Sequence, residues 1–334
     1  MFGLFKDRDE ERQQQQYQQN EPRWEYSRCT GKKKAVLIGI NYYGQDGELS
    51  GCINDVQNLY EFLTTRRGYN PGDIVTLTDD QDHPRRIPTK ENIIAAANWL
   101  VADAAPDDAL FFHFSGHGTH VKDHDGDEHD GRDEAICPVD FDSAGLIVDD
   151  QLHDLLVKPL PVGCRMTVLF DSCHSGSALD LPYMYSTEGK IKEPNRLADA
   201  GQSLLSAAQS YAAGDMGGLI RSAQTLFSVA TGQNDEAHQL TKETRTSEAD
   251  VIFLSGCKDE QTSADTVEGG EATGAMSFAF ISVLTEKPQL TYKELLVNVR
   301  EILRNKYSQK PQVRLCCLLL DFTLLVKLFA HLVT

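Results

Sequence analysis

The sequence is poor in basic residues. Its 334 residues include 32 lysines and arginines against 50 aspartates and glutamates, which gives a net charge of −18. A protein that binds nucleic acid or an anionic membrane through its general surface needs the opposite balance. We therefore expect no nucleic-acid partner and no membrane partner. The acidic surface instead favours cationic substrates or metal ions.

The sequence also lacks a long uninterrupted apolar run. Met1–Phe5 is followed at once by charged residues, so no secretory signal is predicted. The apolar segment 313–334 is broken by charged residues and falls short of the ~18 residues that a membrane span needs. We expect a strand and a packing segment there.

The eight cysteines form no regular framework and include no CxxC pair. Without a signal peptide before them, this pattern predicts reduced thiols in a cytoplasmic protein, with the nucleus as an alternative. No glycine-rich phosphate loop follows the first predicted strand either, because residues 39–44 read GINYYG and do not fit GxGxxG. This argues against a nucleotide-binding module.

What the chain does contain is an alternation of apolar runs and amphipathic segments. Buried strands are predicted at 34–40, 74–77, 109–114, 166–170 and 250–255. Helices are predicted at 56–67, 89–105, 275–284 and 292–307, with a shorter one ending at Val157. Such an alternation indicates right-handed crossovers and an α/β fold with a mostly parallel central sheet.

Composition divides the chain into segments. The glutamine-rich residues 1–32 cannot bury enough apolar surface and are predicted to be a disordered prodomain, although such tracts can also self-associate. Residues 186–249, rich in small polar residues, are predicted to be a flexible linker. The linker would join a large lobe (33–185) to a small lobe (250–312), and 313–334 would follow.

Two of the predicted strands end in polar turns that hold a cysteine and a histidine. The strand at 166–170 runs into DSCHSG, and the strand at 110–114 runs into SGHG. Open α/β sheets place their ligand crevices at the carboxyl ends of their strands. A thiol with a pKa near ~8.5 also needs a base to become a nucleophile. We therefore predict that Cys173 is a nucleophile and His117 its base.

Other cysteines and histidines fit this role less well. A lone cysteine in a strand is more often inert core, but polar neighbours surround Cys173 and Gly176 permits a sharp turn. His174 would point to the opposite face of the strand, and His113 lies among phenylalanines. The backbone N–H groups of Gly118 and Cys173 are the expected oxyanion donors.

These motifs, together with the first strand and GCIND at 51–55, resemble a type I metacaspase of fungal type. The resemblance runs from about Gly31 to Gln312. It implies a caspase-like three-layer sandwich and a cysteine endopeptidase that cleaves after Arg or Lys. The chain contains no caspase-type QACRG pattern, and acidic residues lie near the predicted crevice, which agrees with a basic preference.

The resemblance assigns an acidic S1 pocket to Asp55 and Asp171, with Cys52 and Ser115 lining it. Two carboxylates could bind a guanidinium group bidentately. Asp171 precedes Cys173 by two positions, so both would face the same side of the strand. Asp55 could also be the N-cap of the following helix.

An acidic stretch at 123–134 raises the question of a metal site. It is not an EF-hand, because Glu128 stands where that loop requires glycine and no helices flank it. The resemblance instead implies Ca²⁺ ligands at four aspartates, namely Asp133, Asp149, Asp150 and Asp180. Alternatively, Asp149 and Asp150 only complement the dipole of the helix that they open.

Basic residues in the linker, combined with a pocket for Arg or Lys, predict a self-processing zymogen with Lys242 and Arg245 as favoured cut sites. The resemblance further implies a monomer that acts on proteins or peptides in regulated cell death, stress response or protein quality control. The alternative is a non-proteolytic scaffold that binds aggregates through the glutamine-rich tail. The segment after Gln312 departs from the family pattern, so whether it completes the sheet stays open.

Overall fold

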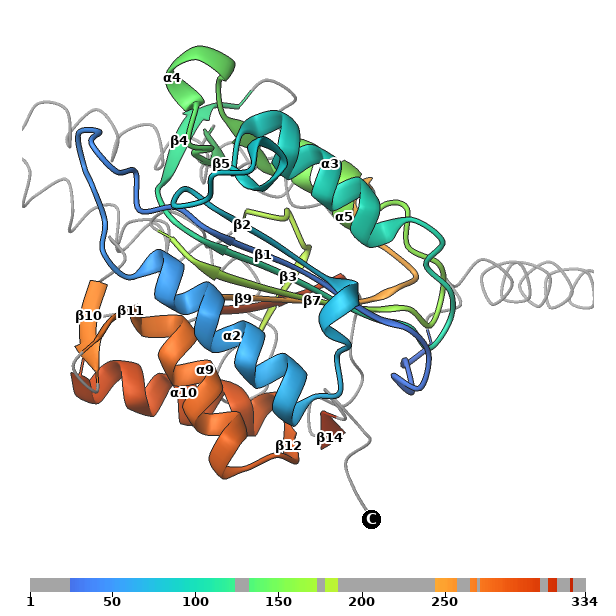
Figure 1. Ribbon diagram of the computed structural model, residues 1–334. Coiled ribbons are helices and arrows are strands. Elements are labelled where there is room, and N and C mark those ends of the chain that lie inside the picture. Colours follow the sequence, from blue (N-terminus) through green and yellow to red (C-terminus); the bar gives the residue numbers. More distant parts are fainter. Residues whose placement is uncertain are drawn as a thin grey trace, which may run out of the picture.

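The computed structural model places a seven-stranded sheet at the centre of the molecule (Figure 1). The strands run in the order β2-β1-β3-β7-β9-β13-β8. Their bounds are β1 Lys33–Gly39, β2 Ile74–Thr78, β3 Ala109–Ser115, β7 Arg165–Asp171, β8 Tyr183–Tyr185, β9 Asp250–Ser255 and β13 Gln312–Leu315. The structure describes residues 25–123, 132–172, 178–185, 244–256, 265–268, 271–306, 312–316 and 325–326.

The first five strands of this order pair in parallel, as the continuous apolar runs predicted. Strands β3, β7 and β9 are buried along their whole length, which requires helices on both faces. Strand β13 pairs antiparallel with β9 and β8. The segment after Gln312 therefore does contribute a strand to the sheet, and the α/β prediction is confirmed.

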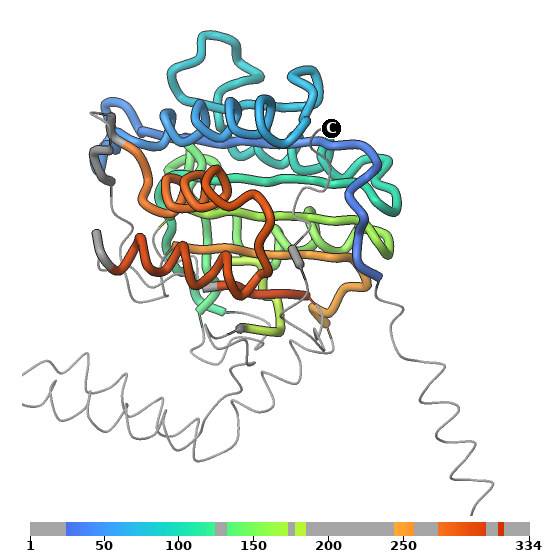
Figure 2. Tube along the Cα trace, turned by 90° about the horizontal axis from the view of Figure 1, so that it is seen from below, coloured from blue at the N-terminus to red at the C-terminus, as the bar shows by residue number. Residues whose placement is uncertain are grey.

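Helices cover both faces of the sheet (Figure 1). Helices α2 (Cys52–Arg66), α9 (Ala275–Glu286) and α10 (Tyr292–Lys306) lie on one face, and α3 (Lys90–Val101) and α5 (Asp149–Leu156) lie on the other. Figure 2 looks onto the first face, where α9 packs between α2 and α10. The result is the expected three-layer arrangement.

Local capping signals locate two of the helix starts. The hydroxyl of Thr89 accepts a hydrogen bond from the Asn92 N–H at 3.3 Å, so Thr89 is the N-cap of α3. Thr291 and Glu294 form a reciprocal capping box at α10, with bonds of 3.1 and 2.7 Å. In contrast, α2 begins at Cys52 rather than Val56, because Gly51 provides no side-chain cap that the sequence could reveal.

A three-stranded sheet adjoins the main one and consists of β4 (Gly118–Lys122), β5 (Arg132–Ile136) and β6 (Ile147–Val148). The acidic stretch at 123–134 therefore ends within a strand, since Asp133 lies in β5. The remaining elements are η1 (Pro71–Asp73), η2 (Pro84–Arg86), α4 (Phe141–Ala144), β10 (Asp265–Glu268), β11 (Glu271–Gly274), β12 (Leu290–Thr291) and β14 (Leu325–Val326).

The two predicted lobes share one continuous sheet, because β7 of the large lobe pairs with β9 of the small one. Arg165 and Asp250 form a buried ion pair across the start of these strands. The backbone N–H of Ser27 donates to Asp250 at 3.2 Å, so residues 25–32 pack on the body rather than belonging to a disordered tail. Residues 1–24 and 186–243 lie outside the described part of the chain.

Candidate active site

Strands β3 and β7 are neighbours and end in register, with Ser115 opposite Asp171 as the last pair. His117 and Cys173 each follow this pair by two positions. The register therefore leads both halves of the predicted dyad to the same edge of the sheet. Cys173 itself lies outside the described residues, and the described chain reaches the buried Ser172 just before it.

The imidazole of His117 is held by a backbone carbonyl. Its Nε2 lies 2.5 Å from the carbonyl oxygen of Gly47. Because a carbonyl oxygen only accepts, Nε2 carries the proton, and Nδ1 is the basic nitrogen of the neutral ring.

Tyr42 supports His117 from the loop after β1. Its hydroxyl accepts a hydrogen bond from the His117 N–H at 2.9 Å and donates one to the Cys137 carbonyl at 2.6 Å. The two rings lie 4.6 Å apart between centroids. Tyr42 has a φ of 55°, an uncommon value for a bulky residue. Neither Tyr42 nor Gly47 was predicted to be part of the site.

His113 is excluded as the base by its surroundings. It is fully buried within β3, and its Nδ1 lies 3.0 Å from the Leu169 carbonyl oxygen. Burial lowers the pKa of His113 to about 3, so the ring is neutral. It is a core histidine, as predicted.

Gly118 lies where an oxyanion donor is expected. The Cys137 N–H donates to the His117 carbonyl at 3.0 Å, and Gly118 faces Ile136 in the β4–β5 ladder. This pattern makes Gly118 and Ile136 a non-hydrogen-bonded pair, so the Gly118 N–H points away from β5. The Gly118 N–H therefore makes no hydrogen bond to β5 within the β4–β5 ladder.

Asp55 lies in the first turn of α2 and is fully buried. It is not an N-cap, because Gly51 holds that position. Its Oδ2 accepts a hydrogen bond from the Ser115 hydroxyl at 2.7 Å. Its Oδ1 accepts from the Thr273 hydroxyl at 2.5 Å and from the Gly274 N–H at 2.8 Å. All three donors are neutral.

Asp171, at the end of β7, is the second carboxylate of this site and is 4% exposed. Its Oδ2 accepts from the Ser277 N–H at 2.8 Å. Burial, followed by repulsion from Asp171, raises the pKa of Asp55 to about 8. Two carboxylates that crowd each other in a buried site attract a cation. Cys52, which was predicted to line the pocket, is the first residue of α2 and is buried.

A second acidic cluster combines β5 and α5. Carboxylate oxygens of Asp133, Asp149 and Asp150 all lie within 4.8 Å of one another. Burial, with Asp180 as the next cause, raises the pKa of Asp149 to about 10. The structure thus brings three of the four predicted ligands together and places Asp180 near enough to repel Asp149. The donor set consists of hard oxygens, which suits Ca²⁺.

Arg245 contacts this cluster. Its guanidinium forms an ion pair with Asp150, and the ring of His153 lies 3.2 Å from the Arg245 carbonyl. Only 8% of Arg245 is exposed. This buried position was not predicted, and Lys242, the other predicted cut site, lies outside the described residues.

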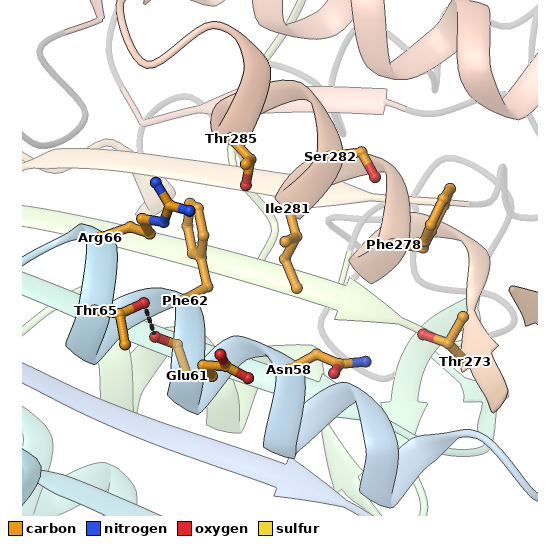
Figure 3. A pocket seen from close by; sticks show the side chains of 10 residues that line it. All are labelled: Asn58, Glu61, Phe62, Thr65, Arg66, Thr273, Phe278, Ile281, Ser282 and Thr285. Carbon is orange, nitrogen blue, oxygen red and sulfur yellow. Dashed lines mark hydrogen bonds between the residues drawn. The ribbon is translucent and has the colours of Figure 1, made fainter. Parts of the chain in front are cut away.

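A groove of about 440 Å³ lies between α2 and α9 (Figure 3). Thr273 is at one end and Thr285 at the other, with Phe62, Phe278 and Ile281 as its apolar lining. The groove contains neither His117 nor the aspartate pair. Thr273, which lines the groove, also donates a hydrogen bond to Asp55.

Comparisons with known proteins agree with this geometry. The family model for the metacaspase, peptidase C14 domain, matches residues 33–182. Metacaspase-1 of Cryptococcus neoformans is 58% identical over 89% of this chain and 65% of its own length. Metacaspase-1 of Yarrowia lipolytica is 60% identical over 87% of this chain and 63% of its own length. The chain thus spans somewhat less than two thirds of these two relatives.

Metacaspase-1 of Mycosarcoma maydis is 57% identical, over 87% of this chain and 72% of its own length. A solved structure from Geobacter sulfurreducens superposes with a TM-score of 0.52 at 21% identity, covering 85% of this chain and 93% of that one. This last likeness concerns the fold alone. The chain belongs to the type I metacaspases, a family of cysteine peptidases with a caspase-like α/β fold.

Proposed function

We propose that the protein is an endopeptidase that cleaves after Arg or Lys. The observation that carries this proposal is the buried pair of Asp55 and Asp171 directly beside the strand ends that lead to His117 and Cys173. A P1 guanidinium or ammonium group would relieve the repulsion between the two carboxylates, whereas a P1 carboxylate would increase it. The same pair thus selects the substrate and fixes its scissile bond near the dyad.

The proposed reaction is acyl transfer. His117 Nδ1 takes the thiol proton of Cys173, and the thiolate attacks the carbonyl carbon after the basic residue. The N–H groups of Gly118 and Cys173 stabilise the oxyanion. The C–N bond then breaks, and His117 returns the proton to the leaving amine. A water molecule, deprotonated by His117, finally hydrolyses the thioester.

Calcium dependence is part of the proposal. Asp133, Asp149 and Asp150, with Asp180 nearby, would hold the ion, whose charge relieves the repulsion among them. A bound Ca²⁺ would offset the negative charge of these aspartates. It would also link β5, which contains Asp133, to α5, which contains Asp149 and Asp150. Strand β5 pairs with β4, whose first residue is Gly118. The ion would therefore stabilise the hairpin that carries an oxyanion donor.

We further propose that the chain is a monomeric cytoplasmic zymogen that processes itself in the linker, with Lys242 or Arg245 as the cut site. Its substrates would be proteins with basic P1 residues, in regulated cell death, stress response or protein quality control. The buried Arg245 supports a link between calcium and processing, because the ion and this side chain would compete for Asp150.

The test uses matched fluorogenic peptides that end in Arg or in Asp, with and without millimolar Ca²⁺. We expect cleavage of the Arg peptide alone, with a requirement for Ca²⁺ and with complete loss in Cys173→Ala. Cleavage after Asp would overturn the pocket assignment. The absence of any cleavage by folded protein would favour the scaffold alternative.

A further inference from the structure

The junction between β11 and α9 holds both carboxylates of the proposed S1 pocket. Thr273 and Gly274 donate to Asp55 at 2.5 and 2.8 Å, and the Ser277 N–H donates to Asp171 at 2.8 Å. The bonds to Asp55 cross 218 and 219 positions of the chain. The large lobe therefore supplies the charges, and the small lobe supplies groups that fix them.

The absence of a side chain at Gly274 is essential to this arrangement. A Cβ there would lie 2.1 Å from Asp171 Oδ2 and 2.6 Å from Asp55 Oδ2. Real Cβ atoms do not approach other atoms so closely, so one or both carboxylates would have to move. The backbone of Gly274 has ordinary dihedral angles, with φ −72° and ψ 139°. Glycine is thus needed here for space rather than for conformational freedom.

The N-terminal end of α9 provides partial positive charge that stabilises the carboxylate of Asp171. Ser277 lies in the first turn of this helix, where backbone N–H groups lack helical partners and carry partial positive charge. A carboxylate that binds such an N–H is held in place without an added cation. The junction therefore supplies neutral hydrogen-bond donors to both aspartates.

We infer that the β11–α9 junction determines the P1 specificity of this peptidase, with Thr273, Gly274 and Ser277 as positioning residues for the two aspartates. Thr273 and Gly274 fix the orientation of Asp55, Ser277 fixes that of Asp171, and the bare Cα of Gly274 lets both carboxylates converge on one P1 cation. The inference rests on the proposed function, since it concerns the same pocket.

The test compares two peptides that differ only in P1, one with arginine and one with citrulline, its uncharged near-isostere. The ratio of their kcat/KM values measures recognition of the P1 charge. We expect Thr273→Val, which removes the donated hydrogen bond but keeps the shape, to lower this ratio about ten-fold through KM. Gly274→Ala should lower it at least as much, and Thr273→Ser should restore it.

Two control variants isolate the effect. Thr285→Val makes the same chemical change at the opposite end of the α2–α9 groove (Figure 3). Gly72→Ala places a Cβ at 3.6 Å from its nearest neighbour, an ordinary contact. Both should keep the wild-type ratio. Alkylation of Cys173 by iodoacetamide reports the dyad independently and should be equal in all variants.

The outcomes separate the inference from the proposed function. If the wild-type enzyme does not favour arginine over citrulline, both the proposed basic P1 preference and the inference about the junction are contradicted. If the wild-type preference for arginine persists unchanged in Thr273→Val, the inference alone is overturned. An equal loss of kcat/KM on both peptides would also overturn it, because such a loss indicates a merely structural role. If Gly274→Ala does not fold, the comparison of Thr273→Val with Thr273→Ser tests the inference on its own.

Discussion

Arg245 and Asp150 form an ion pair at the edge of the acidic cluster. Asp150 is one of the three aspartates whose carboxylates converge there, so the guanidinium and a calcium ion would compete for one carboxylate. The pair is only partly accessible, since the Arg245 side chain is 10% exposed. The proposed metal site and a proposed cut site are thus physically connected.

This competition predicts that removing the Arg245 charge strengthens calcium binding. In the Cys173→Ala background, Arg245→Gln should bind Ca²⁺ about ten-fold more tightly by isothermal titration calorimetry, because the ion no longer displaces a cation. Lys158→Gln is the matched control, because Lys158 pairs at 3.0 Å with the exposed Asp154 rather than with an aspartate of the cluster. Equal affinity in Arg245→Gln and wild type would contradict the competition.

The raised pKa of Asp55 predicts a pH-dependent S1 pocket. Burial and Asp171 raise this pKa to about 8, and a bound guanidinium would lower it by favouring the ionised form. Binding should then release a proton, so affinity for an Arg-terminated peptide should rise between about pH 6 and about pH 8. Calorimetry on Cys173→Ala in buffers of different ionisation enthalpy measures both quantities.

Asp55→Asn is the control for that measurement. It keeps His117 but removes the Asp55 carboxylate, so peptide affinity should fall by about ten-fold or more and the Asp55 part of the proton release should vanish. An unchanged proton release in this variant would assign the titration to another group. Affinity that falls as the pH rises would contradict the proposed sign.

Tyr42 provides a test of how His117 is held. Tyr42→Phe removes the hydrogen bonds that the Tyr42 hydroxyl makes with the His117 N–H and the Cys137 carbonyl, which should cost about 1–3 kcal/mol of unfolding free energy. We expect kcat to fall by about ten-fold while KM changes little, since the substrate pocket is untouched. Tyr43→Phe, at an exposed neighbour, should preserve both values. A Tyr42→Phe enzyme with normal kcat would show that this contact does not position the base.

The buried pair of Arg165 and Asp250 predicts a large effect on stability. Asp250→Asn leaves the Arg165 guanidinium, which is 3% exposed, without its charged partner, and should cost about 3–5 kcal/mol by chemical denaturation. Asp154→Asn breaks an exposed pair and should cost less than ~1 kcal/mol. Similar losses in the two variants would contradict the role of burial.

The sheet, and the neighbouring strand ends that lead to His117 and Cys173, were predictable because their signals are local. Continuous apolar runs identify strands that are buried on both faces, and the polar turns after 109–114 and 166–170 follow neighbouring strands. The capping box of Thr291 and Glu294 is likewise a local signal, because its two residues lie only three positions apart.

The missed features depend on contacts between distant parts of the chain. The roles of Thr273 and Gly274 arise from bonds to Asp55 that span most of the chain length, and the pairing of Arg245 with Asp150 has no local pattern. Strand β8 consists of Tyr183–Tyr185 and exists through its pairing with β13. Such short elements follow tertiary contacts rather than propensity.

The most direct test of the central claim is an unbiased profile of the cut sites. A peptide library made from a digested proteome would be incubated with the enzyme and Ca²⁺, and the new termini would be identified by mass spectrometry. The paired carboxylates of Asp55 and Asp171 predict Arg or Lys at P1 in nearly all products, and none with Cys173→Ala. An enrichment of Asp at P1, or no enrichment of basic residues, would contradict the account.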